Sequence, residues 1–200
     1  NLGSADVALL AAWLQRPEVN AVVEELNLSQ NPIGVDGAKA LAAVLPRSSL
    51  KCLVIGPKST RLPVNDAEVT ELNFEGQDFA ATEVTLVAAA VSTMGALASI
   101  NCLANKFGDD DLATLVAAIE GTSVRSLCGL TEGQTTADFS GQNLGPMDCK
   151  IIAAEYGFQG FIAAVDSIVL SGNELGSIAH GGSVKDYMKA AGLDAWYGYF

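Results

Sequence analysis

The sequence predicts an α/β fold built from repeated strand–turn–helix units. Two observations support this prediction: one pattern of apolar and turn residues recurs along the chain, and stretches with apolar residues at helical spacing lie between its copies. The pattern reads apolar-x-x-apolar-x-apolar-x-x-Asn-x-apolar-Gly, and it is clearest at residues 23–34 and 97–108. Leu26 and Leu53 are 27 residues apart. Self-similarity at such a period is typical of repeat architectures.

Five further segments carry all or part of this pattern. Three of them fit it wholly or in part: residues 69–80, 137–145 and 165–176. Two degenerate copies, at Leu50–Ile55 and Val124–Gly129, keep the strand pattern but lack the Asn and the following helix. They continue into Gly56–Pro63 and Leu130–Gln134, where turn residues predict loops or a β-hairpin in place of a helix.

Helices are expected wherever apolar residues fall at i, i+3 and i+7, because these positions form one stripe of a helix. The expected helices cover residues 5–14, 38–45, 84–91, 112–119 and 149–156. Each copy of the pattern also predicts a strand. In the first one, alternation sends Leu26 and Leu28 into the core and Asn27 to the open face of a parallel sheet.

An Asn or Gln residue and a glycine are expected to shape the turn between each strand and the following helix. Asn31, Asn105 and Asn173 should turn the chain while their amides satisfy backbone groups of neighbouring units, with Gln77 and Gln142 as partial substitutes. Four glycines share one position before a helix, where unusual backbone angles are expected: Gly34, Gly108, Gly145 and Gly176.

Acidic residues open several of the expected helices. Asp109, Asp110 and Asp111 suit the free amides and the dipole of a helix N-terminus, and Asp36 and Asp148 are interpreted in the same way. A calcium loop is not expected, because no Asp-x-Asp-x-Asp-Gly with a distal Glu is present.

This combination of strand, Asn-bearing turn and helix resembles the leucine-rich repeat of the ribonuclease-inhibitor-like class. The resemblance implies a solenoid, or horseshoe, with a parallel sheet on the concave face and helices on the convex face. It implies one domain over residues 1–200, with an N-terminal helix or cap at 1–22, repeats at 23–176 and a C-terminal cap at 177–200. The degenerate copies are similar to leucine-rich-repeat proteins of algae and other protists.

The charge of the chain and its few possible metal ligands exclude several classes of binding partner. The net charge of −12 and the pI near 4.3 argue against nucleic acid and anionic lipid surfaces. Four widely spaced cysteines, namely Cys52, Cys102, Cys128 and Cys149, and the single His180 are too few ligands for a zinc site, so no metal or cofactor is expected.

Free thiols predict an intracellular, cytoplasmic location. A location inside an organelle is the alternative, because the sequence begins at Asn1 rather than Met. The most apolar window, Val84–Leu103, contains polar residues that suit a helix–turn–strand unit better than a membrane span.

The resemblance points to protein binding through the open sheet face, and no catalytic motif such as G-x-S-x-G or H-E-x-x-H is present, so an enzyme is not expected. The expected partner is a protein, and the acidity of this face favours a basic one. The alternative is that these are solvated strand positions without a partner. The expected face residues are Glu25, Asn27, Ser29, Glu71, Asn73, Glu75, Asn101, Leu103, Asp138 and Ser140.

A second hypothesis makes the chain a structural subunit of a multi-subunit complex. Its anchors would be projecting loops at 57–63 and 130–134 and an aromatic C-terminus. The same aromatic residues could instead cap the core of a solenoid. They are Trp196, Tyr197, Tyr199 and Phe200.

Overall fold

A computed structural model of the protein describes residues 1–158 and 160–175. The expected C-terminal cap and its four aromatic anchors, Trp196, Tyr197, Tyr199 and Phe200, lie outside these residues, as does His180. The chain divides into two compact units. The first holds residues 1–70, 77–97 and 106–123, and the second holds residues 71–76, 98–105 and the chain from 124 onward. One repeat domain over residues 1–200 stays a prediction.

The sheet of the first unit has three strands. Strand β1 (Glu25–Asn27) pairs in parallel with β2 (Cys52–Ile55), and β2 pairs antiparallel with β3 (Thr60–Pro63). The register places Leu26 beside Leu53 and Leu53 beside Leu62. The first degenerate copy therefore continues into a β-hairpin, which confirms the prediction for Gly56–Pro63.

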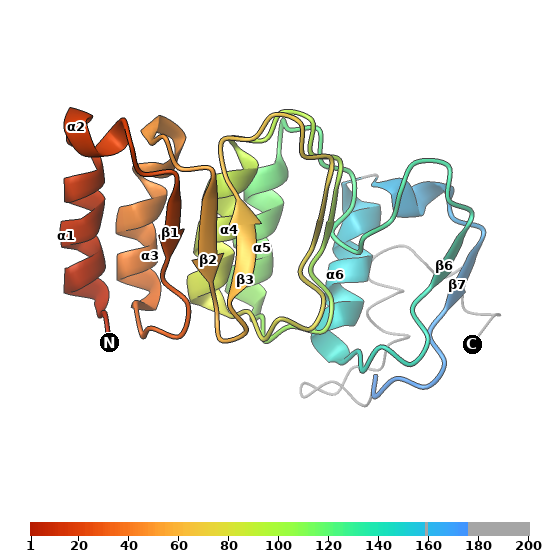
Figure 1. Cartoon of the computed structure of the whole chain (residues 1–200). Helices are drawn as coiled ribbons and strands as arrows, with labels where there is room; N and C mark the ends of the chain where they lie inside the picture. The colour runs from red at the N-terminus through yellow and green to blue at the C-terminus, as the bar shows by residue number, and fades with distance from the viewer. Residues whose placement is uncertain (159, 176–200) are drawn as a thin grey trace. The chain divides into compact units, whose positions relative to one another are not determined.

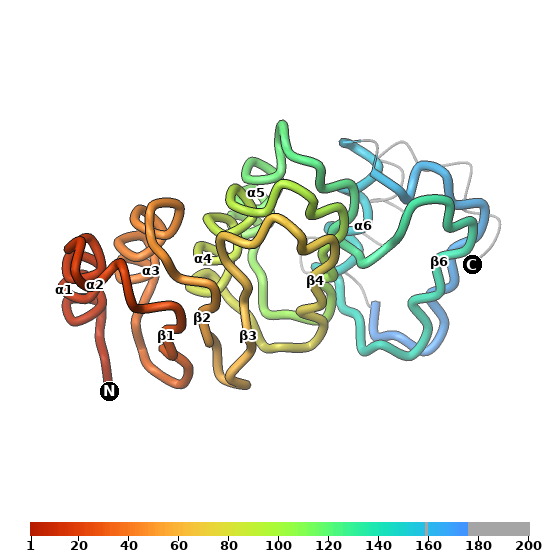
Figure 2. The backbone as a smooth tube through the Cα atoms, turned by 45° about the horizontal axis from the view of Figure 1, so that its top comes forward, coloured from red at the N-terminus to blue at the C-terminus, as the bar shows by residue number. Residues whose placement is uncertain are grey.

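The helices of the first unit form a layer against this sheet (Figures 1 and 2). Its helices are α1 (Ser4–Leu14), α2 (Pro17–Asn20), α3 (Gly34–Ala42), the 3-10 helix η1 (Leu45–Arg47), α4 (Ala81–Val91) and α5 (Asp109–Ile119). Helix α1 contacts α3, α3 contacts α4 and α4 contacts α5. Val7, Leu41 and Leu86 are fully buried in this layer. Helix α3 starts four residues before the expected 38–45 and ends at Ala42, because Pro46 lacks the N–H that a continuing α-helix needs.

The described residues of the second unit form two strand pairs and one long helix. Strand β4 (Glu71–Asn73) pairs in parallel with β5 (Ser99–Asn101), and β6 (Thr136–Asp138) pairs in parallel with β7 (Ser167–Val169). The helices are α6 (Pro146–Gly157) and the 3-10 helix η2 (Phe161–Ala164).

The expected continuous sheet is replaced by small sheets of two or three strands. The second degenerate copy, Val124–Gly129, explains part of this difference. It forms only isolated bridges, Ser99 with Ser126 and Asn101 with Cys128, and no strand of its own. The fold is thus α/β with small parallel sheets.

The Asn side chains of the turns bind backbone carbonyls, as the sequence predicts. Nδ2 of Asn105 donates to the carbonyl of Phe74, 31 residues away, at 2.8 Å and to that of Cys102 at 2.9 Å. Nδ2 of Asn173 donates to Phe139 O at 2.7 Å and to Leu170 O at 3.0 Å. Each side chain therefore links its own turn to the preceding copy of the repeated pattern.

We expect Asn105→Ala to lower the free energy of unfolding by about 1–3 kcal/mol, because it leaves buried carbonyls without a donor. Denaturant unfolding of the purified protein measures this loss. Asn105→Asp is the matched control, since it keeps the size of the side chain but removes the NH₂ group. An Asp variant as stable as the wild type would contradict the assignment.

The residue before each turn Asn or Gln adopts a left-handed conformation, which the sequence analysis missed. The φ values are 58° at Gln30, 62° at Gly76, 56° at Ala104, 64° at Gly141 and 74° at Gly172.

The glycines before the helices behave differently from the expectation. Gly34 has φ 64°, but Gly108 and Gly145 have ordinary φ values of −103° and −115°. The expectation is wrong at these two positions, because a residue that precedes a helix needs only extended backbone. Gly176 lies outside the described residues.

We expect Gly172→Ala to lower the free energy of unfolding by about 1 kcal/mol, because an L-residue is strained at positive φ. The reverse change at the equivalent position, Ala104→Gly, should be neutral or stabilising by up to about 1 kcal/mol. Thermal unfolding of both variants measures the pair. The same sign for both substitutions would contradict the equivalence of the two positions.

Acidic side chains complete the starts of four helices. The carboxylates of Asp6, Asp111 and Asp148 accept hydrogen bonds from the backbone N–H three residues earlier, at 2.9, 2.8 and 2.8 Å. Glu83 accepts the N–H of Ala80 at 3.1 Å in the same way. The capping interpretation of Asp111 and Asp148 is therefore confirmed, whereas Asp36 only lies in the first turn of α3.

Candidate functional site

The expected face residues are mostly accessible. Glu25 and Asn27 of the first unit and Glu71, Asn73, Asp138 and Ser140 of the second are exposed, and Ser29, Glu75 and Asn101 are half-buried. Leu103 differs, because its side chain is 0% exposed. It lies two residues past the end of β5, where strand alternation no longer decides which way a side chain points.

An ion pair crosses the sheet of the first unit. The guanidinium of Arg61 on β3 donates to Glu25 on β1 through both nitrogens, with Nη1–Oε1 at 3.1 Å and Nη2–Oε2 at 2.7 Å. The hydrogen bonds from Arg61 lower the pKa of the Glu25 carboxyl. Both side chains are exposed, so the pair contributes little to stability. It fixes the position of the Glu25 carboxylate on this face.

The strand between the two partners of this ion pair is buried. Cys52 and Val54 on β2, which alternation assigns to the open face, are 8% and 6% exposed. They share the face with Glu25 and Arg61, because Glu25 is in register with Cys52, and Val54 with Arg61. Burial raises the pKa of the Cys52 thiol. Arg61 is not among the expected face residues, although alternation within the predicted hairpin could have placed it here.

The strand ends of both units share one hydrogen-bond pattern. Oδ1 of the last strand residue accepts the backbone N–H two residues later in four places: Asn27 from Ser29 at 3.0 Å, Asn73 from Glu75 at 3.0 Å, Asn101 from Leu103 at 3.1 Å and Asp138 from Ser140 at 2.9 Å. Such Asx turns hold a side chain in one orientation. The expected face residues are therefore fixed by the backbone that follows them.

In the second unit these side chains also bind each other. Nδ2 of Asn101 on β5 donates to Oε2 of Glu75, just after β4, at 3.2 Å. Gly129 packs on Asn101 so closely that a Cβ there would lie 2.9 Å from the Asn101 Cβ. At β6, hydrogen bonds from Ser140 lower the pKa of Asp138. The face presents carboxylates and amides whose geometry is set in advance.

A buried carboxylate behind the second degenerate copy is the main feature that sequence reasoning missed. Glu155 on α6 is 0% exposed. Its Oε2 accepts hydrogen bonds from Ser126 Oγ at 3.1 Å and from the backbone N–H groups of Leu127 at 2.9 Å and Cys128 at 3.1 Å. Among the described residues, Oε1 has no hydrogen-bond partner.

Burial controls the ionisation around Glu155. Loss of solvation raises the pKa of Glu155 itself, against the hydrogen bonds that favour its charged form. Burial, helped by the charge of Glu155, raises the pKa of Cys102 to about 12 and that of Cys128 well above its usual range. These thiols are therefore protonated at neutral pH and are not nucleophiles.

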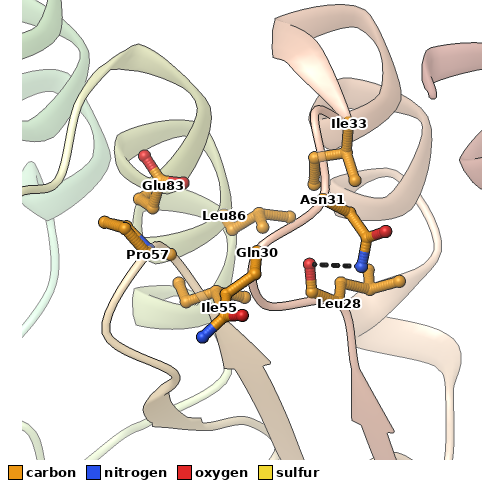
Figure 3. A pocket seen from close by; sticks show the side chains of 9 residues that line it. Leu28, Gln30, Asn31, Ile33, Ile55, Pro57, Glu83 and Leu86 are labelled. Atoms are coloured by element: carbon orange, nitrogen blue, oxygen red, sulfur yellow. Dashed lines mark hydrogen bonds between the residues drawn. The ribbon is translucent and has the colours of Figure 1, made fainter. Parts of the chain in front are cut away.

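Two small cavities lie in the first unit. One of about 160 Å³ has apolar walls that include Leu28, Ile55 and Leu86, with Glu83 as its titratable side chain (Figure 3). The other, of about 260 Å³, is lined by residues that include Leu14, Val44 and Arg47. Neither cavity brings together the several titratable groups that a catalytic site requires.

Residues 1–158 and 160–175 contain no group of three or more His, Cys, Asp or Glu side chains that could hold a metal ion. No helix in the same range has the length and apolar character needed to cross a membrane.

Part of the chain is similar to a known protein family. No curated protein matches the chain. The family model described as Leucine Rich repeat matches residues 19–42, a stretch that contains β1, the turn at Asn31 and all of α3. Leucine-rich repeats generally mediate protein–protein interactions. The match supports the conclusion that this part of the chain is a leucine-rich repeat.

Proposed function

We propose that the protein is a non-enzymatic binding module, a solenoid of ribonuclease-inhibitor-like leucine-rich repeats whose strand face receives a basic protein partner. The Asx turns of the second unit, at Asn73, Asn101 and Asp138, carry this proposal. A polar group that is already fixed loses little conformational entropy on binding, so preorganised groups favour a specific interface.

The charges of the face support a basic partner. Glu71 is exposed and Glu75 is held by Asn101, while Asp138 is exposed with a lowered pKa, so it stays charged well below neutral pH. Lys and Arg side chains bind carboxylates through charge-assisted hydrogen bonds. The net charge of −12 would also steer a basic partner toward the protein.

The buried groups support a non-enzymatic function, and they also support our proposal that the protein is intracellular. Glu155, Cys102 and Cys128 have perturbed pKa values, but all three are at most 3% exposed, so a substrate would not reach them. Free, buried cysteines suit a reducing compartment.

The structural-subunit hypothesis receives less support. The 57–63 loop, which should project in this hypothesis, instead contacts other residues of the first unit. Lys58 pairs with Asp78 at 3.0 Å, and Thr60 Oγ1 donates to Gln77 Oε1 at 2.6 Å. Its aromatic anchors lie outside the described residues.

Affinity capture from the native source with wild-type and Glu71→Lys protein as bait tests the proposal. Glu71 is exposed on β4, so reversal of its charge should abolish capture of a basic partner without unfolding the chain. Asp110→Lys on α5 makes the same charge change on an exposed helix and should leave capture intact. Raising the salt concentration should release the partner, because exposed charge interactions are screened.

Capture that survives Glu71→Lys would contradict the strand face as the binding surface. Capture that resists salt and is lost with variants of the 130–134 loop, such as Glu132→Lys, would favour the structural-subunit hypothesis instead.

A further inference from the structure

The cavity of about 160 Å³ in the first unit lies where the repeated pattern is incomplete. In four copies, the residue two positions after the turn Asn or Gln is apolar and at most 9% exposed. These residues are Ile33, Phe79, Phe107 and Leu144. In the first degenerate copy, 27 residues after the first one, this position is Thr60, which belongs to strand β3. This copy therefore supplies no apolar side chain to the space between Ile33 and helix α4.

The cavity has an apolar floor and a more polar opening. The side chains of the floor are at most 4% exposed, and they are Leu28, Ile33, Ile55 and Leu86. At the opening, Pro57 is exposed and Glu83 is half-buried. In Figure 3, Glu83 and Pro57 lie on one side of the cavity and Ile33 lies on the other. A molecule that enters would bury an apolar part and keep a polar part beside Glu83.

Glu83 is the charged group of this opening. Its Oε2 accepts the N–H of Ala80 at 3.1 Å and so completes the start of α4. Among the described residues, no ion pair neutralises Glu83, because Lys58, which follows Pro57, pairs with Asp78 at 3.0 Å instead. A carboxylate without a cation attracts an ammonium group, which binds it through charge-assisted hydrogen bonds.

We propose that this cavity binds a small primary ammonium compound, with an apolar body on the floor and the ammonium group beside Glu83. Apolar cavities of about 150 Å³ hold molecules the size of benzene, so a body of about six carbon atoms fits. The space is too small for a peptide segment. The site is separate from the strand face and does not depend on the proposed protein-binding function.

The lining disfavours other classes of ligand. The Glu83 carboxylate would repel an anion. Water would find no hydrogen-bond partner among the floor side chains, and apolar cavities of this kind stay dry. A neutral compound of the same shape would gain the apolar contacts but not the charge-assisted hydrogen bond, so it should bind more weakly.

Benzylammonium is the probe, and benzyl alcohol and benzoate are its neutral and anionic controls. Methyl NMR of the whole chain locates the probe, because all four floor residues carry methyl groups. We expect nuclear Overhauser effects from the aromatic protons of benzylammonium to the methyl groups of Ile33, Ile55 and Leu86. Benzyl alcohol should bind about tenfold more weakly, and benzoate should not bind.

Glu83→Gln separates the charge of this side chain from its capping role. The Gln carbonyl still accepts the N–H of Ala80, so the start of α4 is kept. Benzylammonium should bind about tenfold more weakly to this variant, whereas the affinity for benzyl alcohol should change by less than about twofold. Asp110→Asn removes the same charge from an exposed position on α5 and should leave both affinities unchanged.

Ile33→Phe tests the cavity itself. The repeat tolerates the larger side chain, because phenylalanine already stands at the equivalent positions 79 and 107. Its ring should occupy the space and abolish binding of benzylammonium and benzyl alcohol. Thermal unfolding without a probe shows whether the variant is folded. If it is not, the comparison of Glu83→Gln with Asp110→Asn still decides the proposal.

Three results would overturn the proposal. The first is the absence of Overhauser effects to the floor methyl groups at saturating benzylammonium. The second is equal affinity for benzylammonium and benzyl alcohol, which would show a packing void without recognition of charge. The third is contact of these methyl groups with another segment of the chain in the absence of a probe. None of these results changes the outcome of capture with Glu71→Lys, so the proposed function is tested separately.

Discussion

Replacing Glu155 by alanine is expected to lower the free energy of unfolding by about 4 kcal/mol, because the change leaves buried hydrogen-bond donors without an acceptor. One carboxylate oxygen serves the hydroxyl of Ser126 and the amides of Leu127 and Cys128. Among the described residues, this degenerate copy forms bridges only to β5, so no second strand pairs with it to take over these amides. Urea unfolding at neutral pH measures the loss.

Glu155→Gln is the matched control for this prediction. The Gln carbonyl still accepts hydrogen bonds, so the loss should be only about 1 kcal/mol. A glutamine variant as unstable as the alanine variant would show that packing, rather than hydrogen bonding, is the function of Glu155.

The ionisation of Glu155 can be tested with the wild type and the Glu155→Gln variant. Burial raises its pKa in the folded protein above the usual 4.5, so the folded state binds the proton more tightly than the unfolded state. The resulting stabilisation is present below pH 4.5 and is lost as the pH rises through the folded-state pKa. The stability of the wild type relative to Glu155→Gln should therefore fall over this range, and a constant difference would contradict the raised pKa.

The second large effect is expected at Leu53. Leu53→Ala should lower the free energy of unfolding by about 3–4 kcal/mol, because this fully buried side chain would leave a cavity in the first unit. Leu26→Ala, its register partner on β1, should cost only about 1 kcal/mol, because Leu26 is half-buried. Denaturant unfolding of both variants checks the contrast, and equal losses would contradict the incomplete burial of Leu26.

Local features of the fold could be predicted from the sequence. The helices at α1, α4, α5 and α6 follow from apolar spacing, and the hairpin after Gly56 follows from its turn residues. The role of Asn105 follows from its place in the pattern. Each of these features depends on residues that are close together in the sequence, so a short stretch of sequence is enough to predict it.

The features that could not be predicted depend on partners far along the chain. The acceptor for the Leu127 amide is Glu155, 28 residues later, and the cation beside Glu25 is Arg61, 36 residues later. Glu155 lies next to the apolar stripe of its helix and looks like a surface residue. The left-handed position at Gln30 and Ala104 was missed because neither is Gly or Asn, the residues that usually mark such a conformation.

The dependence of Leu127 and Cys128 on Glu155 also sets an order for the formation of the second unit during synthesis. The segment that contains Ser126 and Leu127 leaves the ribosome well before α6, and until then the Ser126 hydroxyl and the Leu127 amide lack their acceptor on Glu155. Packing of this segment must therefore wait for α6. A truncated chain that ends before Glu155 keeps these donors unpaired and would be an early substrate for proteases.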